Sequence, residues 1–129
     1  MRKTGKLGYV EQATMQAFQW KYRYSGIFMV WCTGYLARPE LVAFMRSAKA
    51  NLMEGSGRFT RQSRPEAFMI VLDNVLEETE EMEMVKGQRI RTVTELEAIY
   101  SEAGLLVHKC SEREPMPGNK RDVMVWALY

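Results

Sequence analysis

Two places in this chain carry polar or aromatic side chains directly after an apolar stretch. Trp31 and Tyr35 follow the first stretch, and Asp73 and Asn74 close the second. In open α/β sheets, ligands bind outside the carboxyl ends of the strands, so Asn74 is a candidate ligand-binding residue. The alternative for Asp73 and Asn74 is an ordinary turn or helix cap. Trp31 is either a platform for a substrate or part of the core, and the residues alone leave both open.

An acidic cluster follows Asn74. Its five glutamates could attract a basic peptide by long-range electrostatics. A solvated helix with acid near its N-terminus, which the helix dipole favours, is the simpler interpretation, and we adopt it. The cluster consists of Glu77, Glu78, Glu80, Glu81 and Glu83.

The remaining reactive side chains form no catalytic or metal-binding pattern. His108 lies within a predicted strand, where we expect an exposed or hydrogen-bonded edge residue rather than a base. Cys32 and Cys110 are far apart in the sequence, and one histidine with two cysteines offers little for a zinc site. We therefore predict no metal. We also expect both thiols to be reduced, as in an intracellular protein of the cytoplasm or nucleus.

Length and composition are those of one soluble folded domain. The chain has 129 residues and a mass of 15.0 kDa, with 47% hydrophobic residues, 26% charged residues and a net charge of +2. So small a positive charge does not argue for nucleic-acid binding. No apolar run approaches the roughly 20 residues that span a bilayer, and no secretory signal follows the basic N-terminus. We expect neither a nucleic acid nor a membrane as partner.

Apolar stretches bounded by glycine, proline or polar residues predict the strands. The first stretch is continuous, which is typical of a strand buried on both faces. A turn at residues 115–119 joins the last two strands. The predicted strands cover residues 24–34, 67–74, 105–110 and 122–129.

Two apolar periodicities of helical spacing lie between these strands. The first helix opens at Pro39, which suits a first turn, and the second is capped by Thr94 and ended by Gly104. Residues 77–83 are predicted as an acidic helix or helical turn. We expect residues 1–11 to be loose and residues 53–66 to form a basic surface loop.

The order of these elements predicts the fold class. Alternation of strand and helix in the first half implies parallel strands, and the closing strand pair is antiparallel. The prediction is an α/β fold, a mixed sheet ending in an antiparallel hairpin, as in the C-terminal half of a class I methyltransferase Rossmann-like fold. Residues 1–129 would form a single partial methyltransferase domain.

Five segments, taken in order, carry a family resemblance. They are MQAF at 15–18, YSGIFMVWCTGYL at 24–36, RPEAFMIVLDN at 64–74, SEAGLL at 101–106 and WALY at 126–129. Together they resemble the eukaryotic α-N-terminal protein methyltransferases, from an adenine-lining segment through the fourth and fifth strands to the end of the chain. That family uses S-adenosylmethionine to methylate the α-amino group of proteins that begin X-Pro-Lys, so the implied partners are protein N-terminal peptides.

The resemblance implies roles for substrate-binding residues. Trp31 would pack against the proline of the substrate, since an indole face suits a flat apolar ring. Asn74 would hydrogen-bond the incoming N-terminus, and Tyr35 would orient the amine or relay its proton. Glu83 falls at an acidic position close to the substrate.

The resemblance also implies where the cofactor would lie. Met15 and Gln16 would line the adenine of S-adenosylmethionine, and Val30 is assigned to the same cofactor site. The family's glycine-rich cofactor loop and its ribose-binding acid have no counterpart before residue 12. Lys86 falls at the family's proton-accepting aspartate, where a positive charge is unfavourable, and residues 53–63 resemble an insertion.

These departures shape the functional expectation. We expect a methyltransferase of this type that is inactive as an isolated chain, with its cofactor half encoded elsewhere. The alternative is a degenerate, non-catalytic family member that serves as a binding or partner subunit. Half of a parallel sheet leaves an unpaired edge, so self-association through an exposed edge is also expected.

Overall fold

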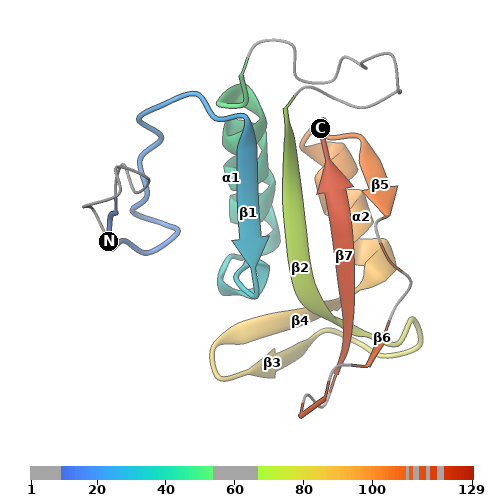
Figure 1. The fold of residues 1–129 in the computed structure, drawn as a ribbon. Coiled ribbons are helices and arrows are strands. Elements are labelled where there is room, and N and C mark those ends of the chain that lie inside the picture. Colours follow the sequence, from blue (N-terminus) through green and yellow to red (C-terminus); the bar gives the residue numbers. More distant parts are fainter. Residues whose placement is uncertain (1–9, 54–66, 110, 112–113, 116, 119–120) are drawn as a thin grey trace.

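The structure, a computed structural model, describes residues 10–53, 67–109, 111, 114–115, 117–118 and 121–129 (Figure 1). Within these ranges the helices are α1 Arg38–Ala50 and α2 Val93–Glu102, with a short 3₁₀ helix, η2, at Thr33–Tyr35. The strands are β1 Gly26–Val30, β2 Phe68–Leu76, β3 Glu83–Val85, β4 Gln88–Thr92, β5 Val107–Lys109, β6 Glu114–Pro115 and β7 Asp122–Leu128.

Strand β2 is the centre of a seven-stranded sheet. β1 runs parallel to its first half, with Val30 opposite Leu72, and β4 runs parallel to its last two residues, Val75 and Leu76. β7 lies antiparallel on the other edge of β2 and also pairs antiparallel with β5. The predicted α/β fold, with a mixed sheet that ends in an antiparallel pair, is therefore confirmed.

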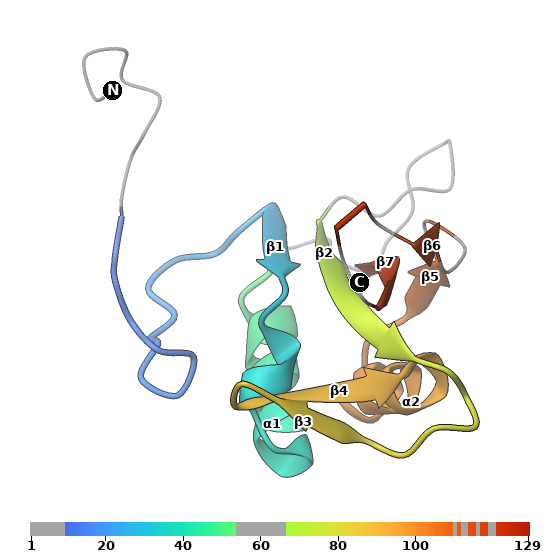
Figure 2. The same ribbon diagram turned by 90° about the horizontal axis from the view of Figure 1, so that it is seen from below.

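Both helices cover the same face of the sheet (Figures 1 and 2). Met69 and Val71 of β2 and Trp126 of β7 point to that face and join α1 and α2 in the hydrophobic core. The interpretation of the first strand as buried on both faces is wrong. Phe28 is 68% exposed and Val30 51% exposed, because alternate residues of a strand face opposite sides and both helices lie on one.

The acidic segment forms a single turn and no helix. The Glu80 N–H donates to the Glu77 carbonyl at 3.0 Å, and the chain then enters a hairpin of β3 and β4. Lys86 and Gly87 connect the two strands with φ values of 51° and 81°. Positive φ at both central residues is the geometry of a type I′ turn, which matches the twist of the flanking strands. Gly87 thus breaks no helix but makes a tight hairpin possible.

The two α-helices follow the predicted periodicities. Pro39 lies in the first turn of α1, and Gly104, at φ 86°, follows the end of α2. The prediction of Thr94 as the cap of α2 is wrong. The N-cap is Thr92, whose hydroxyl oxygen accepts a hydrogen bond from the Glu95 N–H at 3.1 Å. α2 begins directly after β4, two residues earlier than Thr94 suggests. Neither helix, within the described part of the chain, is long and apolar enough to cross a membrane.

Some predictions fall on residues outside the described ranges. These include most of the loose N-terminus, Cys110, and all of the basic loop except Met53. The last predicted strand appears as β7, and the third is shortened to β5. His108 lies in β5 and is exposed, as expected of an edge residue.

The cap of α2 gives a matched pair of variants. Thr92→Ala removes the acceptor for the Glu95 N–H, so we expect the free energy of unfolding to fall by about 1 kcal/mol. Thr94→Ala is the control: Thr94 is exposed in the first turn, and its loss should change stability by less than about 0.5 kcal/mol. Urea unfolding monitored by circular dichroism measures both, and equal effects would contradict the assignment of Thr92.

Candidate functional site

The candidate site lies where β1 and β2 run toward η2. The Trp31 N–H donates to the Leu72 carbonyl at 2.9 Å, which places Trp31 beside the second half of β2. Trp31 is 39% exposed and Tyr35, the last residue of η2, is 48% exposed. Neither side chain is a core residue, which answers the alternative left open for Trp31. Two of the three predicted substrate residues at this end of the sheet are therefore accessible to a ligand.

Trp31 has an unusual backbone conformation. Its φ is 50°, in the left-handed region that bulky side chains rarely adopt. This residue turns the chain out of β1 and into η2. Strain of this kind persists only where the surroundings hold it, and it concentrates at functional sites.

The buried carboxylate of Asp73 fixes the segment that follows Trp31. Its Oδ2 accepts hydrogen bonds from the backbone N–H of Thr33, at 3.1 Å, and from the Thr33 hydroxyl. Its Oδ1 accepts from the backbone N–H of Asn74 at 2.9 Å. Asp73 and Thr33 are both buried, so these bonds fix η2 against β2 in a region that excludes water.

Two opposing effects act on the pKa of the Asp73 carboxyl. Burial raises the pKa of the Asp73 carboxyl above its ordinary value of 3.8. The hydrogen bonds from Thr33 and Asn74, and the positive charge of Arg91, act in the opposite direction. Hydrogen bonds from the protein, and not contact with water, therefore stabilise the ionised carboxylate in the interior.

Arg91 ties β4 to the same segment. Its guanidinium donates to the carbonyls of Thr33, at 3.3 Å, and of Leu36, at 2.8 Å, and its Nε lies 3.8 Å from Glu95. The side chain is buried, and burial lowers the pKa of Arg91 below its usual value. No local sequence pattern points to Arg91 or Thr33, because their partners lie 40 or more residues away along the chain.

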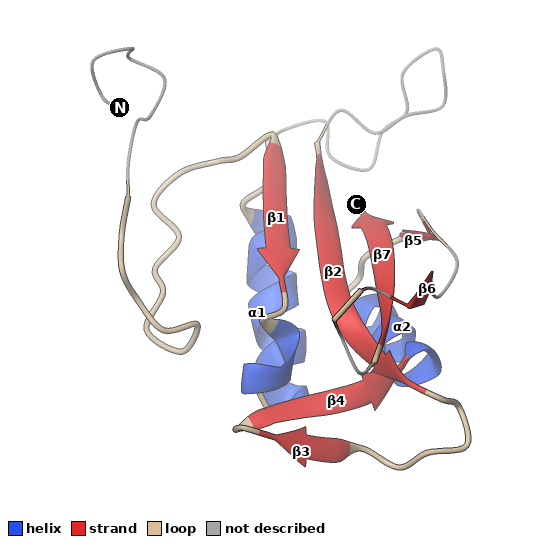
Figure 3. Ribbon diagram, turned by 60° about the horizontal axis from the view of Figure 1, so that its bottom comes forward, coloured by secondary structure: helices blue, strands red, loops and turns tan. Residues whose placement is uncertain are grey.

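The β3–β4 hairpin crosses the end of β1 and packs on η2 (Figure 3). A Cβ atom on Gly34 would lie 2.6 Å from the carbonyl oxygen of Arg89, so only glycine permits this approach. Beside it, Gln88 donates to the Tyr35 hydroxyl at 2.9 Å. A hydroxyl that accepts one hydrogen bond keeps its own O–H and a second lone pair, so Tyr35 can still orient an amine.

Asn74 and Val30 share the uncovered face of the sheet. Val30 pairs with Leu72, and Asn74 lies two residues further along β2 on the same side. Its side chain is half-buried. The structure therefore brings the predicted substrate residue Asn74 and the predicted cofactor residue Val30 to one end of one face.

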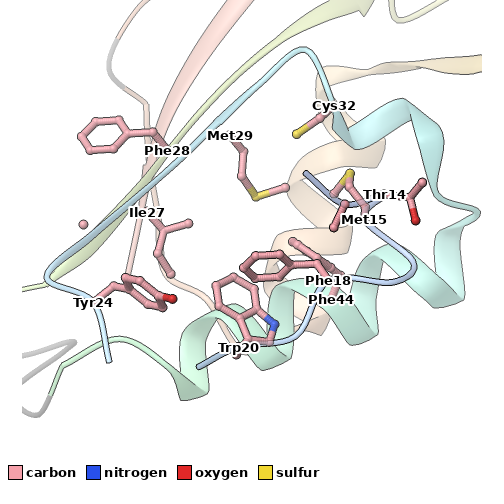
Figure 4. A pocket seen from close by; sticks show the side chains of 12 residues that line it. Thr14, Met15, Phe18, Trp20, Tyr24, Ile27, Phe28, Met29, Cys32 and Phe44 are labelled. Carbon is pink, nitrogen blue, oxygen red and sulfur yellow. The ribbon is translucent and has the colours of Figure 1, made fainter. Parts of the chain in front are cut away.

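The other predicted cofactor residues lie on the segment that precedes β1. The Gln16 amide donates to the Tyr35 carbonyl at 3.4 Å, so Gln16 reaches the candidate site. Met15 packs against the edge of the core and lines a groove between β1 and the N-terminal segment (Figure 4). This contact involves the main chain of Tyr35, and the role of Gln16 toward an adenine stays a prediction.

Glu83 is engaged in an ion pair, and Lys86 carries a positive charge. Glu83 lies in β3 and is ion-paired with Arg121, which also binds Glu80 at 3.2 Å. Lys86 lies in the hairpin turn and is exposed. The hairpin presents Gln88 to Tyr35, not a carboxylate.

The Cys32 thiol is a poor nucleophile, and the described residues offer no metal site. Burial raises the pKa of the Cys32 thiol to about 11, so at neutral pH it holds its proton and is a poor nucleophile. Among the described residues, no group of three or more histidine, cysteine, aspartate or glutamate side chains could hold a metal ion.

The comparisons with known proteins identify the family. The sequence matches the model of the AdoMet-dependent proline di-methyltransferases over residues 2–129. The chain belongs to this family of S-adenosylmethionine-dependent methyltransferases. A search of curated proteins gave no match.

Solved structures of methyltransferases share the fold. An S-adenosylmethionine-dependent methyltransferase of Leishmania major superposes with a TM-score of 0.70 at 18% identity, over 91% of this chain and 43% of that protein. A methyltransferase of Clostridium acetobutylicum gives 0.63 at 11% identity, over 97% and 66%. The mitomycin 7-O-methyltransferase MmcR gives 0.55 at 12%, over 89% and 32%. The chain thus spans less than half of the Leishmania protein.

A substitution at Thr33 tests whether its hydrogen bond to Asp73 stabilises η2. Thr33→Val keeps the side-chain shape and removes one donor to a buried carboxylate, so the free energy of unfolding should fall by about 1.5–3 kcal/mol. Thr94→Val, an exposed position, is the control and should stay within about 0.5 kcal/mol of the wild type. Urea unfolding measures both, and an unchanged stability for Thr33→Val would show that the bond to Asp73 does not form.

The raised pKa of Asp73 predicts a pH dependence. The folded state retains this proton to higher pH than the unfolded state, so the contribution of Asp73 is most favourable below pH 3.8 and falls as pH rises through the folded pKa. The stability of the wild type minus that of Asp73→Asn should therefore decrease as pH rises from about 4 toward about 7. Urea unfolding at each pH measures this difference, in which the other titrating groups cancel. A difference that grows with pH would mean that the hydrogen bonds outweigh burial.

Proposed function

We propose that this chain is the substrate-binding half of a methyltransferase that acts on the α-amino group of proteins that begin X-Pro-Lys. The observation that carries the proposal is the exposed pair Trp31 and Tyr35 at the end of β1. A family described as proline di-methyltransferases requires a surface for a proline ring and groups that orient an amine. This end of the sheet offers both.

Trp31 supplies the surface for the ring. An exposed indole gives a large, rigid apolar face, and such faces pack well against flat apolar rings. The left-handed backbone of Trp31 and the bonds from Thr33 to Asp73 restrain its position before any ligand arrives. A restrained platform loses less conformational entropy on binding than a mobile one.

Tyr35 and Asn74 supply the polar contacts to the amine. The amine must lose a proton before it can attack a methyl group, and positioning then provides much of the rate. Tyr35, with its hydroxyl held by Gln88, can accept a hydrogen bond from the ammonium and orient the nitrogen. The Asn74 side chain lies at the same end of the sheet and can bind the first peptide unit of the substrate.

The residues that would hold the cofactor fit one part of it. Met15 and Val30 are apolar, and the Gln16 amide uses its nitrogen on Tyr35, which leaves its oxygen as an acceptor for the amino group of an adenine ring. When bound, S-adenosylmethionine supplies a methyl group on a sulfonium sulfur. The part that these residues play is to bind the ring at the edge of the site where the amine is held.

A second candidate is a non-catalytic subunit that binds the same peptides. The pairing of Glu83 with Arg121, and a lysine at position 86, favour it, since neither leaves a carboxylate to accept the proton of the amine. Both candidates agree on what the chain binds and differ on whether methyl transfer follows.

Peptide binding tests the shared part. A hexapeptide that begins Ser-Pro-Lys should shift the indole N–H resonance of Trp31 in a titration followed by NMR. Trp31→Ala should weaken binding about tenfold, by the loss of one aromatic contact. Tyr22→Ala removes an exposed aromatic outside the site and should change affinity less than about twofold. The proposal fails if peptides that begin Ser-Ala-Lys or carry an acetylated N-terminus bind equally well.

Methyl transfer then separates the two candidates. The native protein, with S-adenosylmethionine and the same peptide, is assayed for a mass gain of methyl groups. Methylated product supports the enzyme, and its absence together with tight peptide binding supports the non-catalytic subunit.

A further inference from the structure

We infer that Lys86, in the turn of the β3–β4 hairpin, selects substrate peptides that carry a carboxylate side chain at their fourth residue. The inference rests on the proposed function for the binding of the amine and the proline. It adds a preference further along the peptide, which the proposed function leaves open. Lys86 is a specificity-determining residue and takes no part in methyl transfer.

The hairpin carries positive charge at the end that contacts η2. Gln88, which follows the turn, donates to the Tyr35 hydroxyl at 2.9 Å, and the Arg89 guanidinium donates to the Gly34 carbonyl at 3.4 Å. Lys86 lies in the turn itself, two residues before Gln88, and its side chain is exposed. Two cationic side chains of the hairpin therefore border the place where the substrate amine is proposed to bind.

The carboxylates closest to this hairpin are already engaged. Glu83 of β3 is ion-paired with Arg121, which also binds Glu80 at 3.2 Å. Asp73 is buried beneath η2 and accepts its hydrogen bonds there. The two hairpin cations, in contrast, form no ion pair among the described residues. The hairpin thus presents positive charge without a matching carboxylate, which is complementary to an acidic ligand.

The alternation of side chains selects the position of that acid in the peptide. In an extended chain, residues two apart lie on the same side, about 6.6 Å from each other. When the proline at position 2 packs on Trp31, the side chain at position 4 also faces the protein. The lysine at position 3 then points away, so it needs no carboxylate from this chain.

The hairpin is within reach of the fourth side chain. It crosses the end of β1, directly beyond Trp31, and packs on η2 (Figure 3). The approach is close, since a Cβ atom on Gly34 would lie 2.6 Å from the carbonyl oxygen of Arg89. The ammonium of Lys86 is a compact charge on a long, flexible stem, so it can meet a carboxylate on a peptide held by Trp31.

Other side chains at position 4 fit less well. A lysine or arginine would place a like charge beside Lys86 and Arg89, which disfavours binding. An uncharged side chain would leave both cations without a partner and would gain no electrostatic attraction.

Two hexapeptides of identical composition test the preference. Ser-Pro-Lys-Glu-Gln-Ala carries its glutamate at position 4, and Ser-Pro-Lys-Gln-Glu-Ala carries it at position 5, so their net charges are equal. Calorimetric titration of the native protein at low salt should show about threefold tighter binding of the first peptide, the size of an exposed ion pair. In about 0.5 M NaCl the difference should fall below about 1.5-fold. Equal affinities at low salt, or tighter binding of the second peptide, would overturn the inference.

Charge variants test whether Lys86 is the residue responsible. Lys86→Glu should reverse the preference, so that the peptide with glutamate at position 5 binds about threefold more tightly. Lys109→Glu is the matched control, because it changes the net charge equally at an exposed position on β5, at the opposite end of the strand order. It should keep the wild-type preference. A preference that survives Lys86→Glu, or that Lys109→Glu reverses, would contradict the assignment.

Acetylated peptides separate this inference from the proposed function. If both hexapeptides bind equally well with and without an acetylated N-terminus, yet keep the threefold preference, the proposed amine site is refuted and the acid-binding hairpin stands. If acetylation weakens binding but the two unmodified peptides bind equally, the proposed function stands and the preference set by Lys86 is refuted.

Discussion

The buried carboxylate of Asp73 accepts hydrogen bonds from the main chain and hydroxyl of Thr33 and from the main chain of Asn74. An ionised group without such partners would be strongly destabilising in the interior. These bonds therefore fix the positions of the three donor groups. Two of the groups belong to Thr33 in η2 and one belongs to Asn74 in β2, so they lie on both sides of the candidate site. Through Thr33 the carboxylate fixes the turn that displays Trp31 and Tyr35. Arg91 adds β4 to the same assembly by binding the carbonyls of Thr33 and Leu36.

The hairpin of β3 and β4 is the second requirement, and it depends on two glycines. Gly87 permits the tight turn, and Gly34 permits the hairpin backbone to approach η2. A side chain at position 34 would push Arg89 away and carry Gln88 off the Tyr35 hydroxyl. The orientation of that hydroxyl thus depends on a backbone contact between segments more than 50 residues apart. The polar chemistry of the site is set by packing as much as by the residues that would touch a ligand.

Local patterns in the sequence sufficed for much of the fold. Apolar periodicity predicted β2, β7 and both helices, because those elements bury one continuous stretch or stripe against a common core. It failed for residues 77–83, where a run of glutamates suits an exposed helix but Lys86 and Gly87 favour a hairpin. It failed for β1, because burial on a second face depends on which elements cover the sheet. At the candidate site, the resemblance points to Trp31, Tyr35, Asn74 and Gln16, whose roles stay predictions. Thr33 and Arg91 act through partners that only the fold brings near.

The contacts that hold the candidate site are separate from the exposed edge of β1. Trp31 and Tyr35 are held by Asp73, Arg91 and Gln88, all within this chain and all on the helix-covered side or at the end of the strands. The open edge of β1 and the exposed Phe28 and Val30 contribute nothing to that hold. The turn that displays Trp31 and Tyr35 is therefore held without any contribution from that edge. The hold on the candidate site and the exposure of the apolar edge are, on this geometry, separate features of one fold.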